Sequence, residues 1–226
     1  MRTRPSTRKG IGNERLGLLP LSVQPFSAHG LILDNILYFY LLQEEARRRT
    51  MTAINARVLK TGGMAQWDKT TLCSILGTDV GDALEFARTE WPKYYGPNTH
   101  LGFSESWETL AYRYLPQPDN FNLAIWQQVD GIQVLAALAI GNPSRARTHL
   151  TVKWVERFFG KNYLTGRALW TTLTCAEEYA KLLGCERLLI KDPVDSEKYE
   201  QYEYEKYHHP HIAHGGDYLA KELRYE

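Results

Sequence analysis

The sequence predicts an α/β fold, and two stretches carry this prediction. Residues 121–129 and 132–140 are apolar runs separated by Asp130-Gly131, a strong signal for a two-residue hairpin turn. Residues 148–190 then read as a strand, a short loop, a long amphipathic helix and a second short strand. A strand–helix–strand unit is normally a parallel, right-handed crossover. The chain of 226 residues is long enough for one such domain with an appendage.

The first fifty residues are predicted to be an extension in two parts. Residues 1–25 carry several arginines and show no hydrophobic periodicity, which is typical of a disordered basic tail. Residues 30–49 join the apolar run Leu31–Leu42 to a charged end. This run is too short and too polar to span a bilayer, so we expect a docking amphipathic helix and no membrane association. The functional domain is expected over residues 51–226.

Between this extension and the hairpin, the pattern predicts one strand and three short helices. Residues Ala53–Leu59 alternate as a strand does. Helices are expected over Asp68–Leu76 and Asp82–Trp91, the second with an aspartate as its N-cap. A third helix is expected to run from Ser104 to Tyr114. The loop before this third helix is rich in aromatic residues.

The crossover unit contains the stretch that we expect to bind a ligand. Residues 150–155 alternate, so Leu150, Val152 and Trp154 are expected on one face of a strand. Thr165 is the expected N-cap of a helix that ends at a glycine, Gly184. The amides at a helix start lack intrahelical acceptors, and the helix dipole adds positive charge there. This entrance therefore suits a phosphate or pyrophosphate.

The order of these features resembles the GNAT superfamily of acyl-CoA-dependent N-acyltransferases. Its pyrophosphate-binding loop has the pattern (Gln/Arg)-x-x-Gly-x-(Gly/Ala), which Gly166 and Ala168 match, while Tyr163 replaces the Gln or Arg. A later family pattern, Tyr-Glu-Lys-x-Gly-Phe, is matched by residues 204–206 without the Gly-Phe. The resemblance covers residues 52–224. It implies a mixed, mostly antiparallel twisted sheet with a central β-α-β unit that binds acyl-CoA.

The resemblance also implies roles for individual residues. Glu156 is the candidate general base, with a surface role as its alternative, and Tyr204 is the candidate general acid, with Tyr207 as a rival. The expected acyl-CoA contacts are Val155, Phe158, Tyr163, Leu164, Thr165, Gly166, Arg167, Ala168 and Asp192. The expected acceptor contacts, for which ordinary packing is the alternative, are Tyr94, Tyr95, His100 and Trp107.

Two regions near the C-terminus complete the prediction. Residues 196–207 resemble the last helix of the family, and residues 217–225 are a candidate final strand. Four histidines lie between them, at 208, 209, 211 and 214. No cysteine or carboxylate pair with metal spacing accompanies them, so we expect no metal.

The composition favours a cytoplasmic location and is compatible with three functions. The three cysteines form no disulfide framework, which fits a reducing cytoplasm, and the net charge of +1 argues neither for nor against nucleic acid. We expect an N-acyltransferase that uses acetyl-CoA or another acyl-CoA on a small-molecule or protein amine. A non-catalytic CoA-binding or protein-interaction module is one alternative. A toxin or phage-type enzyme that acylates aminoacyl-tRNA or modifies a nucleobase is another. Either a monomer or a homodimer is expected.

Overall fold

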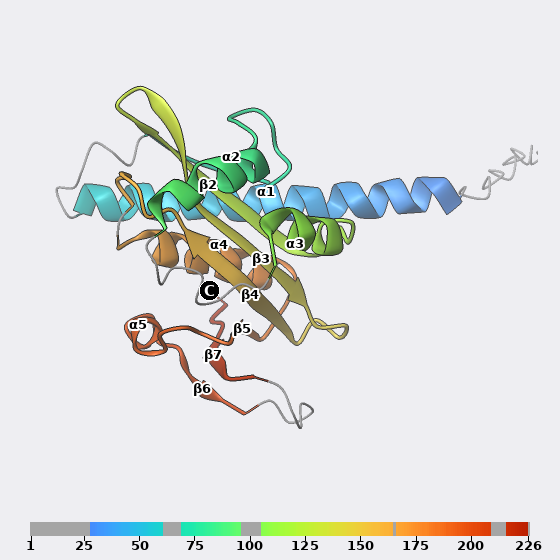
Figure 1. Ribbon diagram of the computed structural model, residues 1–226. Helices are drawn as coiled ribbons and strands as arrows, with labels where there is room; N and C mark the ends of the chain where they lie inside the picture. The colour runs from blue at the N-terminus through green and yellow to red at the C-terminus, as the bar shows by residue number, and fades with distance from the viewer. Residues whose placement is uncertain (1–27, 61–68, 96–104, 165, 209–215, 226) are drawn as a thin grey trace, which may run out of the picture.

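A seven-stranded sheet forms the centre of the protein (Figure 1). The computed structural model describes residues 28–60, 69–95, 105–164, 166–208 and 216–225. In chain order the strands are β1 (Thr70–Cys73), β2 (Phe121–Val129), β3 (Ile132–Pro143), β4 (His149–Arg157), β5 (Arg187–Lys191), β6 (Glu205–Tyr207) and β7 (Tyr218–Glu222). They lie side by side in the order β1-β2-β3-β4-β5-β7-β6. The β4–β5 pair is parallel and the other pairs are antiparallel, which confirms the predicted fold class.

Helices cover both faces of this sheet. They are α1 (Ala28–Lys60), α2 (Ala83–Thr89), the 3-10 helix η2 (Trp91–Tyr94), α3 (Trp107–Tyr114), α4 (Ala168–Leu182) and α5 (Glu197–Glu200). Helices α1 and α4 pack on one face around a first core, which includes Ile54, Leu123 and Ala176. Helices α2, η2 and α3 pack on the other face around a second core, which includes Trp91 and Trp126. No helix among the described residues is long and apolar enough to cross a membrane.

Helix α1 differs from the prediction. It runs without a break from residue 28 to residue 60, so the strand expected over Ala53–Leu59 is wrong, and the boundary expected at residue 51 falls inside the helix. The buried residues Ala46, Thr50 and Ile54 follow at a spacing of four. This spacing places them on one helix face, against the first core. Packing of that face on the domain therefore decides between helix and strand.

Of the three helices predicted before the hairpin, one is wrong and two are present. A helix was expected over Asp68–Leu76, but the described part of this stretch contains β1, which pairs with β2 at the edge of the sheet. The helix expected after Asp82 is confirmed as α2, because the Asp82 carboxylate accepts a hydrogen bond from the Glu85 amide at 2.9 Å. The third helix is present as α3, with Ser106 rather than Ser104 as its N-cap.

The hairpin and the crossover are confirmed. Asp130 and Gly131 both have positive φ, 51° and 85°, as the tight turn between β2 and β3 requires. Helix α4 ends just before Gly184, which has a φ of 79°. The helix expected over residues 196–207 is wrong in extent, because only the four residues of α5 are α-helical and β6 follows. The final strand is confirmed as β7.

Candidate active site

At the centre of the sheet β4 extends beyond the end of its parallel neighbour β5. Strands β4 and β5 pair from His149–Arg187 to Val152–Ile190. Strand β5 ends one residue later, whereas β4 continues for five more residues to Arg157, paired only with β3 among the described strands. The carboxyl end of β4 therefore has an edge that is not covered by β5, at the end of a parallel pair where ligands bind in α/β folds.

A β-bulge in β4 turns its last residues over. Val152 pairs with Gly141 and Trp154 pairs with Ile140, so Lys153 is an extra residue without a partner in the ladder. As a result Val152 contacts the first core, but Trp154 contacts the second core on the opposite face. The prediction that these two residues share a face is therefore wrong. Burial lowers the pKa of the Lys153 ammonium, and the nearby positive charge of Lys191 lowers it further.

Glu156 follows the bulge and lies at the centre of a polar cluster on the second-core face. The Tyr95 hydroxyl donates to its Oε1 at 2.5 Å, and the Trp107 indole N–H donates to its Oε2 at 2.6 Å. These partners come from the end of η2 and the start of α3, so three elements converge on one half-buried carboxylate. Burial and the neighbouring carboxylate of Glu156 together raise the pKa of the Tyr95 hydroxyl.

Local anchors explain why both donors reach this carboxylate. Trp91 opens η2, is fully buried, and donates its indole N–H to the Leu135 carbonyl of β3 at 3.1 Å. This bond fixes η2 on the sheet and places Tyr95 at its end. Ser106 caps α3 by accepting from the Thr109 amide at 3.3 Å, which begins the helix at Trp107. The two tryptophan rings then meet edge to face, with centroids 6.4 Å apart.

The predicted acceptor contacts are largely brought together. Tyr95 and Trp107 bind Glu156 directly. Tyr94 is half exposed and packs edge-on against Phe158, with ring centroids 4.8 Å apart. His100 lies outside the described residues. None of these positions was linked to Glu156 by the sequence, because 61 and 49 residues separate it from Tyr95 and Trp107.

Backbone amides of the loop before α4 donate hydrogen bonds within the protein. The Leu164 amide donates to the Asn162 side chain at 3.0 Å, and the amides of Arg167 and Ala168 both donate to the Leu164 carbonyl. These three expected phosphate donors therefore have acceptors within the protein. Gly166 has a φ of 77°, and a Cβ built there meets no atom within 4 Å. Open space thus lies beside the start of α4, and phosphate binding by this loop remains a prediction.

The flanking acyl-CoA candidates also have partners. The Tyr163 amide donates to the Gln127 side chain at 2.8 Å, and the Phe158 amide donates to the Ala136 carbonyl at 2.8 Å. Val155 is half-buried against the first core. Thr165, the expected N-cap, lies outside the described residues, and Arg167 occupies the N-cap position.

The candidates from the end of the chain lie apart from Glu156. Tyr204 belongs to the first core, on the opposite face, and its hydroxyl donates to Glu177 at 3.0 Å. Burial, with the carboxylate of Glu177, raises its pKa well above the usual range. The Tyr207 hydroxyl accepts from Arg187 at 3.0 Å. Asp192 has a φ of 48° and accepts from the Asp217 amide at 3.0 Å, so it holds the turn at the end of β5.

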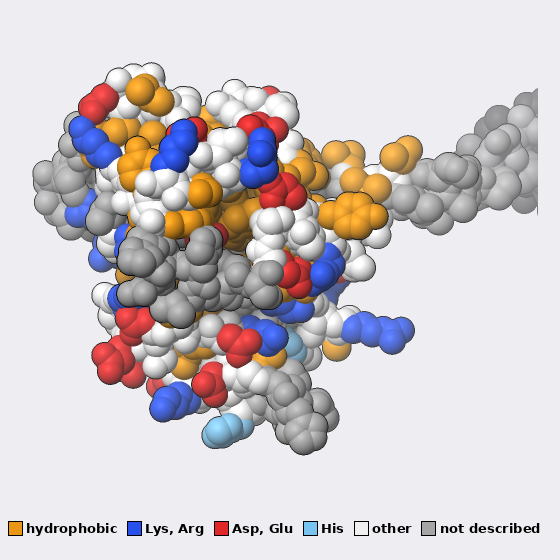
Figure 2. Space-filling model, viewed as in Figure 1, with side chains coloured by type: hydrophobic (Ala, Val, Ile, Leu, Met, Phe, Trp, Pro, Cys, Tyr) orange, Lys and Arg blue, Asp and Glu red, His pale blue; other side chains and the backbone are white. Residues whose placement is uncertain are grey.

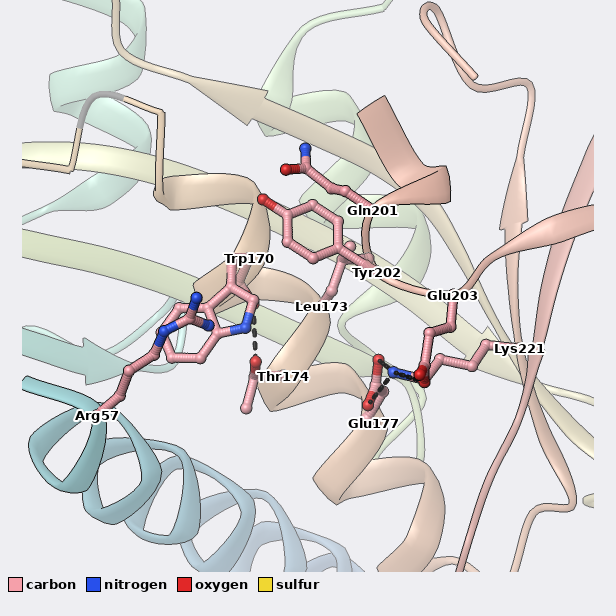
Figure 3. A pocket seen from close by; sticks show the side chains of 9 residues that line it. All are labelled: Arg57, Trp170, Leu173, Thr174, Glu177, Gln201, Tyr202, Glu203 and Lys221. Atoms are coloured by element: carbon pink, nitrogen blue, oxygen red, sulfur yellow. Dashed lines mark hydrogen bonds and ion pairs between the residues drawn. The ribbon is translucent and has the colours of Figure 1, made fainter. Parts of the chain in front are cut away.

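A polar cavity of about 240 Å³ lies on the α4 face of the sheet (Figure 3). The side chains that line it come from α1, α4, the segment after α5, and β7: Arg57, Trp170, Leu173, Thr174, Glu177, Gln201, Tyr202, Glu203 and Lys221. At one end the Arg57 guanidinium lies 4.6 Å from the Trp170 ring centroid. At the other end Lys221 donates to both oxygens of Glu177, at 3.0 and 3.2 Å.

The sequence did not indicate this cavity. Its residues are spread from 57 to 221 and match no motif. One weak signal was available, namely the glutamate at 177, which lies beside the apolar stripe of α4. The Tyr204 hydroxyl reaches the same carboxylate from the core. Tyr204 is thus connected to the α4 cavity, whereas Glu156 belongs to the cluster on the other face.

Comparisons with known proteins give structural similarity alone. No protein-family model and no curated protein matches the sequence. A putative N-acetyltransferase from Lactobacillus plantarum is 14% identical, with a TM-score of 0.47 over 69% of this chain and 99% of that chain. The ribosomal-protein-S18-alanine N-acetyltransferase from Escherichia coli is 17% identical, with a TM-score of 0.42 over 68% of this chain and 92% of that chain. N-acetylglutamate synthase from Neisseria gonorrhoeae, complexed with coenzyme A and N-acetyl-glutamate, is 10% identical, with a TM-score of 0.47 over 69% of this chain and 35% of that chain.

Proposed function

We propose that this chain is an acyl-CoA-dependent N-acyltransferase in which Glu156 is the general base. The amine nitrogen of the acceptor attacks the thioester carbonyl, and Glu156 takes the proton that the nitrogen loses, directly or through one water. The tetrahedral intermediate then collapses, the carbon–sulfur bond breaks, and the coenzyme leaves as a thiolate that takes a proton from Tyr204, the candidate acid, whose hydroxyl is bonded to Glu177 of the α4 cavity. Acetyl-CoA is the simplest donor, and a small-molecule or protein amine is the acceptor class.

The position of Glu156 is the observation that carries this proposal. It lies on β4 beyond the last pair with β5, in the part of the strand whose edge β5 does not cover. Tyr95 and Trp107 each donate to a different oxygen, which fixes the orientation of the carboxylate. A carboxylate held in one orientation meets the geometric requirement for a base.

The acyl donor is assigned to the α4 face. In the α4 cavity Arg57, beside the aromatic ring of Trp170, is the cation that suits a coenzyme phosphate, because Lys221 is paired with Glu177 and Glu203. Open space beside Gly166 adds room at the start of α4. The donor and the acceptor would then approach β4 from its two faces, since Glu156 and its donors belong to the face that α3 covers.

Two glycine variants test the donor site. Gly166→Glu adds a long acidic side chain at the start of α4 and is expected to weaken acetyl-CoA binding at least 30-fold (about 2 kcal/mol) by bulk and like charge. Gly184→Glu is the matched control, because Gly184 also has a positive φ and open space but lies at the other end of α4. Both are measured by titration calorimetry. Equal affinity in the two variants would remove the donor site from the start of α4.

Two glutamate variants test the base. Release of coenzyme A from acetyl-CoA is followed with a panel of amines, and Glu156→Gln is expected to lower turnover by about 10²–10⁴-fold. Glu186→Gln, an exposed glutamate just before β5, is expected to be unchanged. Turnover of Glu156→Gln within threefold of the wild type would exclude Glu156 as the base.

A second function, a binding module without catalysis, is favoured by one set of observations. The amides of Leu164, Arg167 and Ala168 have acceptors in the protein, and Tyr204 is 1% exposed and bound to Glu177. Such a module would release no coenzyme A with any amine of the panel, and calorimetry with acetyl-CoA would separate a module that binds the coenzyme from one that binds only a protein partner. Measurable turnover that depends on Glu156 rejects this second function.

A further inference from the structure

Helix α1 has a part that is outside the domain. From Phe39 onward one face of the helix is buried against the first core, at residues such as Ala46 and Ile54. The turns before Phe39 extend past the rest of the molecule (Figure 1). The space-filling view shows hydrophobic side chains on this extending part (Figure 2). Apolar side chains in this position contact water instead of the core.

Five of the six exposed apolar residues on this part of α1 form one stripe, and Tyr38 lies off it. Leu33, Ile36, Leu37, Tyr40 and Leu41 are 66, 47, 54, 51 and 56% exposed. They follow at positions i, i+3, i+4, i+7 and i+8, which is the pattern of a continuous helix face. We call these five residues the outer stripe. It is centred more than a third of a turn, about 130°, from the face that Phe39 and Ala46 present to the core. Asn35 lies off the stripe, whereas Asp34, seven residues before Leu41, borders it.

The accessible area of the outer stripe is about what one partner contributes to a small protein interface. Five half-exposed side chains leave on the order of 100 Å² each, or about 500 Å² in one copy. Two copies that bury this surface remove about 1,000 Å² from water, which reaches the lower limit of a specific protein interface. A patch of this size is near the upper end of what monomeric proteins expose, and such patches often bind a partner.

We infer that the outer stripe is a homodimer interface, in which α1 pairs antiparallel with α1 of a second copy. A two-fold axis beside Leu37 would place Leu33 opposite Leu41 of the partner, so apolar residues meet apolar residues along the stripe. The spacing is that of helix pairs that pack through one seam. The antiparallel direction is favoured because the domain covers α1 only from Phe39 onward. It leaves the two domains at opposite ends of the helix pair.

A second copy fits this surface better than a charged partner. The stripe itself contains no ionisable side chain except the phenol of Tyr40, so it offers no charge for recognition of nucleic acid or of an acidic peptide. A self-complementary surface needs only the same residues on both sides. The dimer is independent of the acyltransferase proposal, because the stripe shares no residue with the Glu156 cluster or the α4 cavity.

The mass of the full-length protein in solution tests the dimer. Light scattering after size exclusion, from about 1 to 100 μM, is expected to give twice 26.0 kDa, or 52.0 kDa. Leu37→Glu places a charge in the seam and is expected to raise the dimer dissociation constant at least 100-fold. Asn35→Glu, on the same helix but off the stripe, is the matched control and is expected to remain dimeric. Both positions are exposed, so circular dichroism should show both variants folded.

Cross-linking gives an independent readout of direction. Under mild oxidation a mixture of Leu33→Cys and Leu41→Cys is expected to form a disulfide-linked dimer, as the antiparallel register requires, whereas Leu33→Cys alone and the wild-type cysteines are not. A disulfide-linked dimer of Leu33→Cys alone would show parallel helices. A wild-type protein that is monomeric at 100 μM would overturn the inference. Equal masses for Leu37→Glu and Asn35→Glu would do the same. Sedimentation of a monomeric wild type with phospholipid vesicles, lost in Leu37→Glu, would assign the stripe to a membrane surface instead.

Discussion

Replacing Glu156 by alanine is expected to destabilise the protein by about 2–4 kcal/mol. The substitution removes the acceptor for two donors at once, the Tyr95 hydroxyl and the Trp107 indole N–H. A partly buried donor that loses its acceptor costs about 1–2 kcal/mol. Trp107 is the costlier of the two, because it is 6% exposed and an indole N–H can only donate. For a chain of this length the loss corresponds to a melting temperature lowered by about 5–15 °C.

Glutamine at the same position is expected to cost about 1 kcal/mol or less. Its carbonyl oxygen accepts from Trp107, and its amide donates to the Tyr95 hydroxyl, which is also an acceptor. Two charge-assisted bonds become neutral, but the cost of holding a half-buried charge is removed as well. Alanine and glutamine thus separate the structural contribution of Glu156 from its ionised state.

Thermal and urea unfolding followed by tryptophan fluorescence measure both variants. Glu186→Ala is the control, because its side chain is 67% exposed and lies 3.9 Å from its nearest cation. Its stability is expected within about 0.5 kcal/mol of the wild type. If Glu156→Ala matched this control, water would satisfy both donors. The cluster would then lack the fixed geometry on which the role of Glu156 as a base depends.

Three further predictions concern other parts of the chain. Gly131→Ala is expected to lower stability by about 1–2 kcal/mol in urea unfolding, because Gly131 has a φ of 85°; an unchanged midpoint would contradict the assigned hairpin turn. Burial raises the pKa of the Cys175 and Cys185 thiols to about 11. Iodoacetamide at pH 8 is therefore expected to label these two cysteines only after denaturation. Mass spectrometry that finds either of them labelled in the native protein would contradict their burial. Tyr204→Phe removes a donor to Glu177 and is expected to lower turnover at least tenfold with acetyl-CoA affinity within threefold; equal turnover would exclude it as the acid.

The elements that could be predicted from the sequence are those set by local signals. The Asp130-Gly131 turn needs two residues with positive φ, and both have it. Asp82 caps α2 through a bond to an amide three residues away. Helix α4 ends before a glycine with positive φ. In each case the residues that determine the geometry are neighbours in the chain.

The elements that were missed depend on partners far away in the chain. The stretch from Ala53 to Leu59 alternates as a strand does, but Ile54 is buried because α1 packs on α4 and the sheet. Strand β1 exists because β2 provides its hydrogen bonds. The acceptor candidates Tyr95 and Trp107 were named for their type and place in the chain, and only the fold shows that both donate to Glu156.

The β-bulge at Lys153 connects the fold to the proposed chemistry. Without the extra residue, Glu156 would share a face with Val152 and point toward the first core, away from Tyr95 and Trp107. With it, the carboxylate turns to the second-core face, where both donors lie. The last pair with β5 also falls at Val152, immediately before the bulge. A direct attack needs the amine, with the base beside it, to approach one face of the planar thioester carbonyl. Strand β4 meets this need, because its edge is uncovered after Val152 and the bulge at Lys153 directs the Glu156 carboxylate to one face.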